Sequence, residues 1–382
     1  MERTIFETEH NLIRDAVRSF ATEHISPFYE QWEEDGQVDR DMWRKAGEAG
    51  LLSPNVPAEF GGMEADFRVN AVIGEELSAM GFISQAVGFS IHSDITVPYI
   101  MNYGTQEQKE KYLPACITGD IVLALAMSEP AAGSDLQGIK TTAVKDGNDY
   151  ILNGSKVFIT NGQHADLVLV VAKTDPTAGA KGISLFLVEA DSVGFSRGQN
   201  LKKIGLHSQD TSELFFDNVR VPVENLLGSE GMGFIMLMSE LPTERMSVSV
   251  GAIASAQSIL QQTIAYTSER KAFGKPIAGF QNTQFKLAEM DTDITVAQVF
   301  VDRCLELLVE GKLDDVTAAK VKLMTSELQC KVIDECLQLH GGYGYMMEYP
   351  VARAFLDSRV QRIYAGTSEI MKVIISRNLF LK

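Results

Sequence analysis

Cysteine and histidine are scarce in this chain of 382 residues, which has four cysteines and six histidines. The cysteines form no CxxC pair and no Cys–His spacing typical of a metal ligand set. The histidines are scattered, and no two of them form an HExxH-like pair. Because a chain of this length can bury a large core, we expect neither a disulfide framework nor a bound catalytic metal.

The chain also has fewer basic than acidic residues and no long apolar run. The chain has 34 Lys and Arg residues against 51 Asp and Glu residues, a net charge of −17. Nucleic acids and anionic membrane surfaces attract basic patches, so we expect neither as a partner. The longest apolar run, Ile121–Met127, is far shorter than the ~18 residues of a membrane-spanning helix.

The first residues, MERTIFETEHNLIRD, carry charges of both signs. Signal peptides have an apolar stretch here, and transit peptides are rich in Arg and poor in acidic residues. We therefore expect no targeting segment and a cytoplasmic protein of bacterial type. If the chain is a processed mature form, the mitochondrial matrix is the expected compartment.

Helical periodicity occupies both ends of the chain. Within residues 1–121, Leu12, Ala16 and Phe20 recur every four residues, with Ile13 and Val17 beside them, which predicts one apolar helical face. Residues 233–382 carry longer patterns of the same kind and predict a bundle of helices joined by short loops. Four long helices are expected there, at about 246–267, 287–308, 314–340 and 368–377.

The middle part, residues 122–232, has a different pattern. Short apolar segments rich in β-branched residues alternate with Asp146–Gly147, Asn153–Gly154 and Asn161–Gly162, dipeptides that favour hairpin turns. This pattern predicts a compact antiparallel β domain. The chain has no βαβ alternation and no GxGxxG motif, which argues against a Rossmann fold.

The fold class is therefore α+β with three domains. We expect an N-terminal all-helical domain over 1–121, a middle antiparallel β-barrel-like domain over 122–232 and a C-terminal four-helix bundle over 233–382.

Four segments carry residue types suited to ligand binding: Ala126–Gly138 (AMSEPAAGSDLQG), Phe158–Gly162 (FITNG), Gln338–Tyr345 (QLHGGYGY) and Ile363–Ile370 (IYAGTSEI). Their small and turn-forming residues expose backbone amides, which can cradle a pyrophosphate or bind a flat polar ring. A capped helix start also favours an anion. Taken singly, each segment equally fits a surface loop, a hairpin in the core, a helix end or a helix cap.

Taken together and in this order, the segments resemble those of the acyl-CoA dehydrogenase family over essentially the whole chain. Three further stretches support the resemblance: LNGSKVFITNG, the run Arg270–Lys275, and the continuation of the third segment to Asp357. The resemblance implies FAD as cofactor, an acyl-CoA substrate, electron-transferring flavoprotein as the acceptor and a homotetramer.

The resemblance also implies which residues bind the cofactor. Around the flavin ring these are Leu125, Met127, Ser128, Gly133, Ser134, Phe158, Ile159 and Thr160, with Thr160 reaching flavin N5. The dinucleotide of a neighbouring subunit is expected to contact Arg270, Phe273, Gln281, Gln338, Leu339, His340, Gly341 and Gly342. Thr367 and Glu369 are expected to contact the ADP part of the cofactor in their own subunit. The residues expected along the acyl-CoA are Ser134, Pro242, Thr243, Arg245, Ala365, Gly366 and Ser368.

A catalytic base is needed to remove the α-proton of the thioester. Most family members carry a glutamate directly after the Tyr of the I-Y-x-G-T motif, but Ala365 occupies that position here. The branch with the long-chain and isovaleryl enzymes places its base on an earlier helix, where this chain has Glu244 in ELPTER. The apolar surroundings of Glu244 favour a raised pKa. The plain alternative is an exposed helical glutamate, and Glu240 is the fallback base.

The predicted reaction converts an acyl-CoA to a trans-2-enoyl-CoA, with hydride transfer to flavin N5. The resemblance implies that the Ala365 N–H and a ribityl hydroxyl bind the thioester oxygen. The long-chain branch is the most similar, which indicates a medium- to long-chain or branched acyl group. The alternatives are an acyl-CoA oxidase and a non-catalytic acyl-CoA-binding member of the family.

Overall fold

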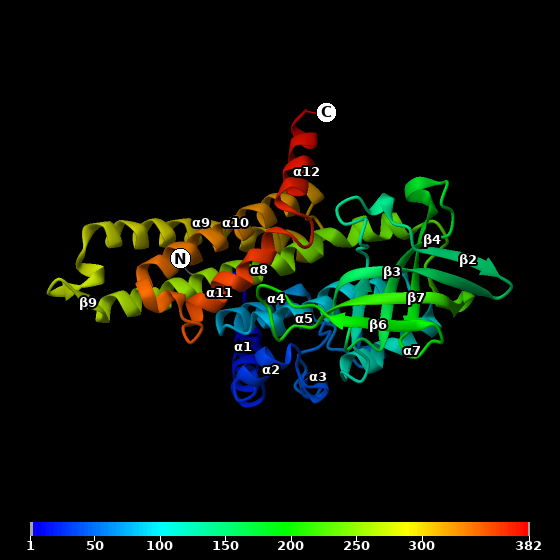
Figure 1. Ribbon diagram of the computed structural model, residues 1–382, viewed down its shortest axis with the longest axis horizontal. Coiled ribbons are helices and arrows are strands. Elements are labelled where there is room, and N and C mark those ends of the chain that lie inside the picture. The colour runs from blue at the N-terminus through cyan, green and yellow to red at the C-terminus, as the bar shows by residue number, and fades with distance from the viewer. Residues whose placement is uncertain (1–2, 381–382) are drawn as a thin grey trace.

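A computed structural model describes residues 3–380 and shows helices, then a sheet, then helices along the chain (Figure 1). This order confirms the expected α+β class. In Figure 1 the sheet lies at one end of the molecule, and the long C-terminal helices extend toward the other end. The N-terminal helices lie along one side of these two parts.

The N-terminal part consists of short and medium helices: α1 (Thr8–Phe20), α2 (Tyr29–Asp35), α3 (Arg40–Glu48), α4 (Phe67–Ala79), α5 (Ile83–Ser90), α6 (Val97–Tyr103) and α7 (Gln106–Ile117). The π-helical segment Ile91–Thr96 joins α5 directly to α6. On α1 the buried face carries Val17 and Phe20, whereas Leu12 is 66% exposed. The expected face is therefore correct for Val17 and Phe20, with Ile13 half-buried beside them, whereas Leu12 and Ala16 lie outside it.

Eight strands form the sheet of the middle part: β1 (Leu123–Ala126), β2 (Thr142–Asp146), β3 (Asp149–Thr160), β4 (Leu167–Lys173), β5 (Ile183–Glu189), β6 (Phe195–Asn200), β7 (Thr211–Pro222) and β8 (Leu226–Leu227). The strand order is β6-β7-β3-β2-β4-β5-β8, with β1 also beside β4. Most pairs are antiparallel as expected, but β1 and β2 both pair with β4 in parallel.

The three expected turns have three different outcomes. Asp146–Gly147 begins the hairpin between β2 and β3, as predicted. Asn153–Gly154 lies inside β3 at a shift of register, so the predicted turn there was wrong. A Cβ on Gly154 would lie 2.4 Å from the Thr141 hydroxyl, so glycine serves close strand packing here. Asn161–Gly162 follows the end of β3, but no hairpin forms because β4 pairs with β1, β2 and β5.

The C-terminal part contains three long helices and two short ones: α8 (Gly233–Glu269), α9 (Gln281–Val309), α10 (Asp315–His340), α11 (Pro350–Ser358) and α12 (Ser368–Phe380). A small hairpin, β9 (Lys271–Ala272) and β10 (Lys275–Pro276), separates α8 from α9. Helix α8 starts earlier than expected because it continues through Pro242. Within residues 3–380, no helix combines the length and the apolar character needed to span a membrane.

The packing of these helices differs in one respect from the expected bundle. Val351 and Ala354 of α11 lie in the same apolar core as α8, α9 and α10. Helix α12 points away from the long helices in Figure 1. Helix α11, which the sequence pattern did not predict, thus packs together with the three long helices.

Candidate active site

Glu244 lies in the first third of α8 and is 5% exposed. The Tyr99 hydroxyl donates a hydrogen bond to Glu244 Oε1 at 3.1 Å. Burial raises the pKa of Glu244 to about 7, and the nearby Glu240 charge acts in the same direction. The Tyr99 hydrogen bond and the Arg245 charge oppose this shift without cancelling it. Glu244 is therefore not an exposed helical glutamate but a buried carboxyl group that can accept a proton near neutral pH.

Glu240 lies one helical turn before Glu244 and is also buried. The amide of Asn102 donates a hydrogen bond to it at 3.0 Å. Both carboxyl groups therefore face α6, the helix that carries Tyr99 and Asn102. The fallback base occupies the same surroundings as the first candidate.

A buried lysine, Lys322, lies between the surroundings of Glu244 and the segment that contains Ala365. Lys322 of α10 is fully buried and donates to the Gly366 carbonyl at 2.7 Å. Burial lowers the pKa of Lys322 to about 8, and the charge of Arg245 contributes to that shift. Lys322 is thus near both Arg245, the neighbour of Glu244, and Gly366, the neighbour of Ala365. The segments that carry Glu244 and Ala365 therefore both lie near Lys322.

An ion pair holds the segment that follows β1. Lys156 of β3 is fully buried and lies 2.8 Å from the Glu129 carboxylate. It also donates to the Met127 carbonyl at 3.0 Å, and Val157 N–H donates to Ser128 O at 3.0 Å. The backbone N–H groups of Lys140 and Thr141 complete the hydrogen bonding of Glu129. Because the charge is paired and hydrogen-bonded, this segment has a defined path over the sheet.

The predicted flavin-facing residues lie on this held segment and on the end of β3. Phe158 has φ +60° and is 69% exposed, so its ring projects from the strand. Ile159, by contrast, is buried in the sheet core and offers only its backbone to a ligand. Leu125 and Met127 pack on the apolar cluster that contains Tyr99. Of the other members, Ser128 and Thr160 are half-buried, and Gly133 and Ser134 are exposed.

Six of the eight residues predicted to contact the dinucleotide line a groove between the end of α8 and the end of α10. The groove has a volume of about 590 Å³ and contains Arg270 together with Gln338, Leu339, His340, Gly341 and Gly342. The ring of His340 stacks on Tyr266 with centroids 4.2 Å apart. Arg270 lies over the ring of Tyr343 at 5.4 Å. A cation, flat rings and open glycines make this groove suited to a phosphate-containing aromatic ligand.

The remaining predicted residues are more scattered. Phe273 and Gln281 are exposed and do not line the groove. Thr367 accepts from the Ile370 N–H and so begins α12, with Glu369 exposed in its first turn.

Two residues that were expected along the acyl-CoA instead contact carboxylate side chains of this chain. Ser368 is buried and donates to Glu327 at 2.6 Å. Arg245 is buried and pairs with Asp315, while Pro242 and Thr243 are half-buried.

Sequence reasoning assigned no role to Tyr99, to the Glu129–Lys156 pair or to Lys322. Glu129 and Lys156 lie within the two motifs AMSEPAAGSDLQG and LNGSKVFITNG. Their presence in these motifs could have indicated a role at the site. No local pattern distinguishes Tyr99 or Lys322 from ordinary helical residues. Their contacts join residues far apart in the chain and require the folded arrangement.

Three family models match the chain in the order found in the fold. They are the N-terminal domain of acyl-CoA dehydrogenase over residues 7–120, the middle domain over 124–219 and the C-terminal domain over 231–380. The chain belongs to the acyl-CoA dehydrogenase family. The suspected resemblance is thereby confirmed.

Individual members of the acyl-CoA dehydrogenase family are similar over nearly the whole chain. The long-chain specific acyl-CoA dehydrogenase of mitochondria from Rattus norvegicus is 50% identical over 379 residues, which cover 99% of this chain and 88% of the rat protein. A crystal structure of an acyl-CoA dehydrogenase from Geobacillus kaustophilus has a TM-score of 0.97 and 48% identity, covering 99% of this chain and all of that one. An acyl-CoA dehydrogenase from Bacillus anthracis, solved as a complex with FAD, has a TM-score of 0.92 and 34% identity, covering 99% of this chain and 67% of that one.

Proposed function

We propose that this protein is an FAD-dependent acyl-CoA dehydrogenase that converts a medium- to long-chain or branched acyl-CoA to the trans-2-enoyl-CoA, with Glu244 as the base. The observation that carries this proposal is the state of Glu244. It is buried, has a pKa raised to about 7 and has no lysine or arginine within salt-bridge distance among residues 3–380. Its chain neighbour Arg245 pairs with Asp315 instead. A buried carboxylate without a bound cation is suited to accept a proton.

FAD fits the residues that the family resemblance implies for it. At Gly133, Gly341 and Gly342 an added Cβ would meet no atom within 4 Å in the described part of the chain, which leaves open space for a ligand. The projecting ring of Phe158 suits a flat partner, and Arg270 suits a diphosphate. When bound, FAD supplies the acceptor for the hydride that leaves the β-carbon.

The thioester oxygen needs a hydrogen-bond donor while the α-proton leaves, because negative charge develops there. The Ala365 N–H suits this role. Among residues 3–380, no backbone carbonyl accepts a hydrogen bond from it. Ala365 has φ +50°, and Lys322 holds the adjacent Gly366 carbonyl. We therefore propose that the Ala365 backbone N–H donates a hydrogen bond to the thioester oxygen and that Glu244 accepts the α-proton.

The experiment is anaerobic mixing of the purified protein with straight and branched acyl-CoAs of increasing length. The expected result is a yellow protein whose flavin absorbance bleaches, with the best substrate among the medium, long or branched chains. A protein that binds acyl-CoA without bleaching would contradict the proposal and support the non-catalytic alternative. A colourless preparation that cannot be loaded with FAD would contradict the cofactor assignment.

Electron-transferring flavoprotein is the proposed acceptor, on the family resemblance alone. The expected result is that this protein or an artificial acceptor restores the flavin colour, whereas oxygen does so poorly once product is bound. Rapid formation of hydrogen peroxide at each turnover would instead support the oxidase alternative.

The proposed assembly is a homotetramer in which the groove beside Arg270 and His340 receives the cofactor of a neighbouring subunit. Light scattering of the FAD-loaded protein is expected to give four subunits. A stable FAD-bound monomer would contradict the shared site, while leaving the assignment of Glu244 open to its own test.

A further inference from the structure

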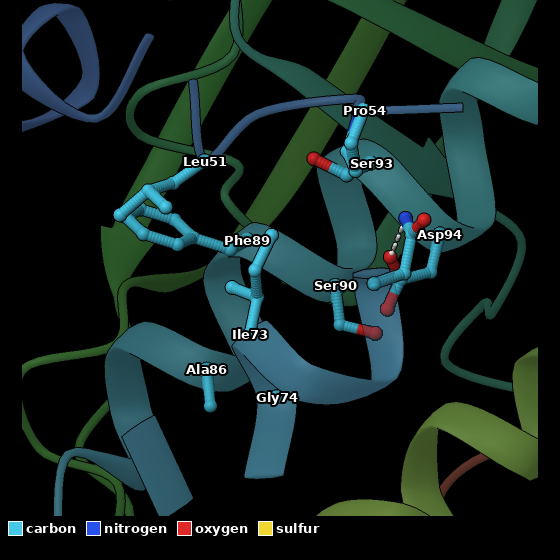
Figure 2. Close-up of a pocket in the computed structure, with 10 residues that line it drawn as sticks. Leu51, Pro54, Ile73, Gly74, Ala86, Phe89, Ser90, Ser93 and Asp94 are labelled. Atoms are coloured by element: carbon cyan, nitrogen blue, oxygen red, sulfur yellow. Dashed lines mark hydrogen bonds between the residues drawn. The ribbon is translucent and has the colours of Figure 1, made fainter. Parts of the chain in front are cut away.

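A small cavity lies between the segment around Leu51, helix α4 and the helix formed by α5 and the π-helical segment after it (Figure 2). Its volume is about 10 Å³, enough for about one water molecule. Figure 2 shows Leu51 and Phe89 at one end and Ser90 and Asp94 at the other. The cavity therefore has an apolar end and a polar end.

Asp94 lies at the polar end. Asn70 Nδ2 donates a hydrogen bond to Asp94 Oδ1 at 2.7 Å, and the hydroxyls of Ser90 and Ser247 lie close enough to this carboxyl group to favour its ionised form. Burial raises the pKa of Asp94, because no cation compensates its charge within the described residues. Asp94 nevertheless remains partly accessible, as does Ser90.

Asn70 adds an unused hydrogen-bond acceptor to this group. The residue is 4% exposed, and its Oδ1 atom has no hydrogen-bond partner among residues 3–380. A buried polar atom without a partner is costly, so such an atom beside a cavity favours a ligand that donates a hydrogen bond. The acceptor and the Ser90 hydroxyl together can bind one O–H group.

The polar group is close to the proposed base. Ser247, which lies close to Asp94, is three residues after Glu244 on α8, a rise of about 4.5 Å along the helix axis. Residues three apart share one helical face. An acyl chain whose α-carbon faces Glu244 can therefore reach Asp94 with a carbon farther along the chain. The π-helical segment Ile91–Thr96, which carries Asp94, is a feature frequent at functional sites.

We propose that Asp94, Asn70 and Ser90 form a polar subsite that selects acyl-CoA substrates with a hydroxyl group on the acyl chain. The inference rests on the proposed function and names a substrate class within it. The substrate O–H donates to Asn70 Oδ1 and accepts from Ser90 Oγ, replacing a trapped water. An unsubstituted chain would leave these groups without partners and so bind less well.

The test uses dodecanoyl-CoA and its isomers with one hydroxyl group at successive carbons from the middle to the end of the chain. The measurement is kcat/KM for anaerobic flavin reduction. The parent protein is expected to prefer at least one hydroxylated isomer over dodecanoyl-CoA by about tenfold, because a site built to bind a hydroxyl rejects the analogue without it. Equal or lower rates for every hydroxylated isomer would overturn the proposal and indicate a trapped water only.

Two substitutions at one position provide the matched control. Asp94→Leu keeps the branched shape of the side chain but removes the hydrogen bond that orients Asn70, and it is expected to abolish the preference. Asp94→Asn keeps shape and hydrogen bonding and is expected to retain it. An unchanged preference in Asp94→Leu would overturn the proposal.

If Asp94→Leu does not fold, Asn70→Ala provides the same comparison, and retention of the preference there would equally overturn the subsite. A parent protein whose flavin is reduced by none of the acyl-CoAs tested would instead contradict the proposed function.

Discussion

Two buried glutamates show how a partner decides what a carboxyl group can do. Glu129 in the middle part has Lys156 at 2.8 Å and two backbone N–H donors. Burial opposes its ionisation, but the Lys156 charge and these hydrogen bonds lower its pKa below the ordinary value. Glu244 on α8 has one Tyr99 hydroxyl, and burial raises its pKa to about 7. The first glutamate fixes a loop, while the second is suited to accept a proton.

The two glutamates also affect stability in opposite ways. A carboxyl group whose pKa is lowered on folding stabilises the folded state above its unfolded pKa, and this contribution is lost as pH falls. Glu129 is of this kind. Glu244 has a raised pKa, so the folded state loses stability as pH rises from its ordinary value of 4.5 through about 7. Stability given up at Glu244 is consistent with a functional carboxyl group.

The largest expected effect comes from Glu244→Gln. This change keeps the volume but removes the proton acceptor, so flavin reduction should fall by about 10²–10⁴-fold or more. FAD content and acyl-CoA binding should be retained, and the free energy of unfolding at alkaline pH should not fall, because an unfavourable buried charge is removed. Stopped-flow absorbance measures the rate. Reduction at the parent rate would mean that Glu244 is not the base, and Glu240→Gln would be the next variant to test.

A second substitution in the Glu244→Gln variant tests whether positions 244 and 365 face the same α-carbon. In Glu244→Gln, the change Ala365→Glu returns a carboxylate to the position most family members use. Partial recovery of flavin reduction is expected, with an altered chain-length preference. No recovery in a folded, FAD-loaded protein would mean that the two positions do not face the same α-carbon.

Lys156→Met is expected to be the most damaging change for stability. It leaves the Glu129 charge buried without a partner, which typically costs about 3–5 kcal/mol in the free energy of unfolding. The protein should melt at a lower temperature and retain less FAD, because the loop after β1 loses its anchor. The double variant Lys156→Met with Glu129→Gln should recover part of the loss. An unchanged melting temperature in the single variant would show that the pair is not needed to hold this loop.

The pH dependence of kcat/KM should report Glu244 directly. The base must be ionised to accept a proton, so activity should rise with pH and level off above about 7, the pKa of the free protein. One unit below that pKa, activity should be about tenfold below the plateau. Steady-state rates in buffers of constant ionic strength measure the profile. A profile that is flat between pH 5 and 9 would argue against a base with this pKa.

The smallest expected effect comes from Tyr99→Phe. The Tyr99 hydroxyl stabilises the ionised form of Glu244, so its removal should raise the pKa of Glu244 further. One hydrogen bond is worth about 1 kcal/mol, or somewhat less than one pKa unit. The rising limb of the pH profile should move to higher pH by that amount, with the plateau changed only a few-fold. A shift to lower pH would contradict the assigned hydrogen bond.

Much of the fold was predictable because hydrophobic periodicity reports local structure. The change from helical to strand patterns near Ile121 and back near Gly231 follows the observed elements. The errors occurred where tertiary contacts overrule local preference. Asn153–Gly154 is a good turn dipeptide, yet it lies within β3 because Thr141 packs against it. Helix α8 continues through Pro242, although proline usually ends a helix.

The sequence by itself determined the three-part order, the family and the position of Glu244 as the candidate base, since these depend on motifs and on the vacancy at Ala365. Only the tertiary structure decided the state of that glutamate. Its pKa depends on desolvation, on Tyr99 from 145 residues away and on the charges of Glu240 and Arg245. The same holds for Lys156 beside Glu129 and for Asp94 beside Asn70 and Ser247. Electrostatic energies depend on distance in space and on local solvation, and a linear sequence specifies neither until the chain has folded.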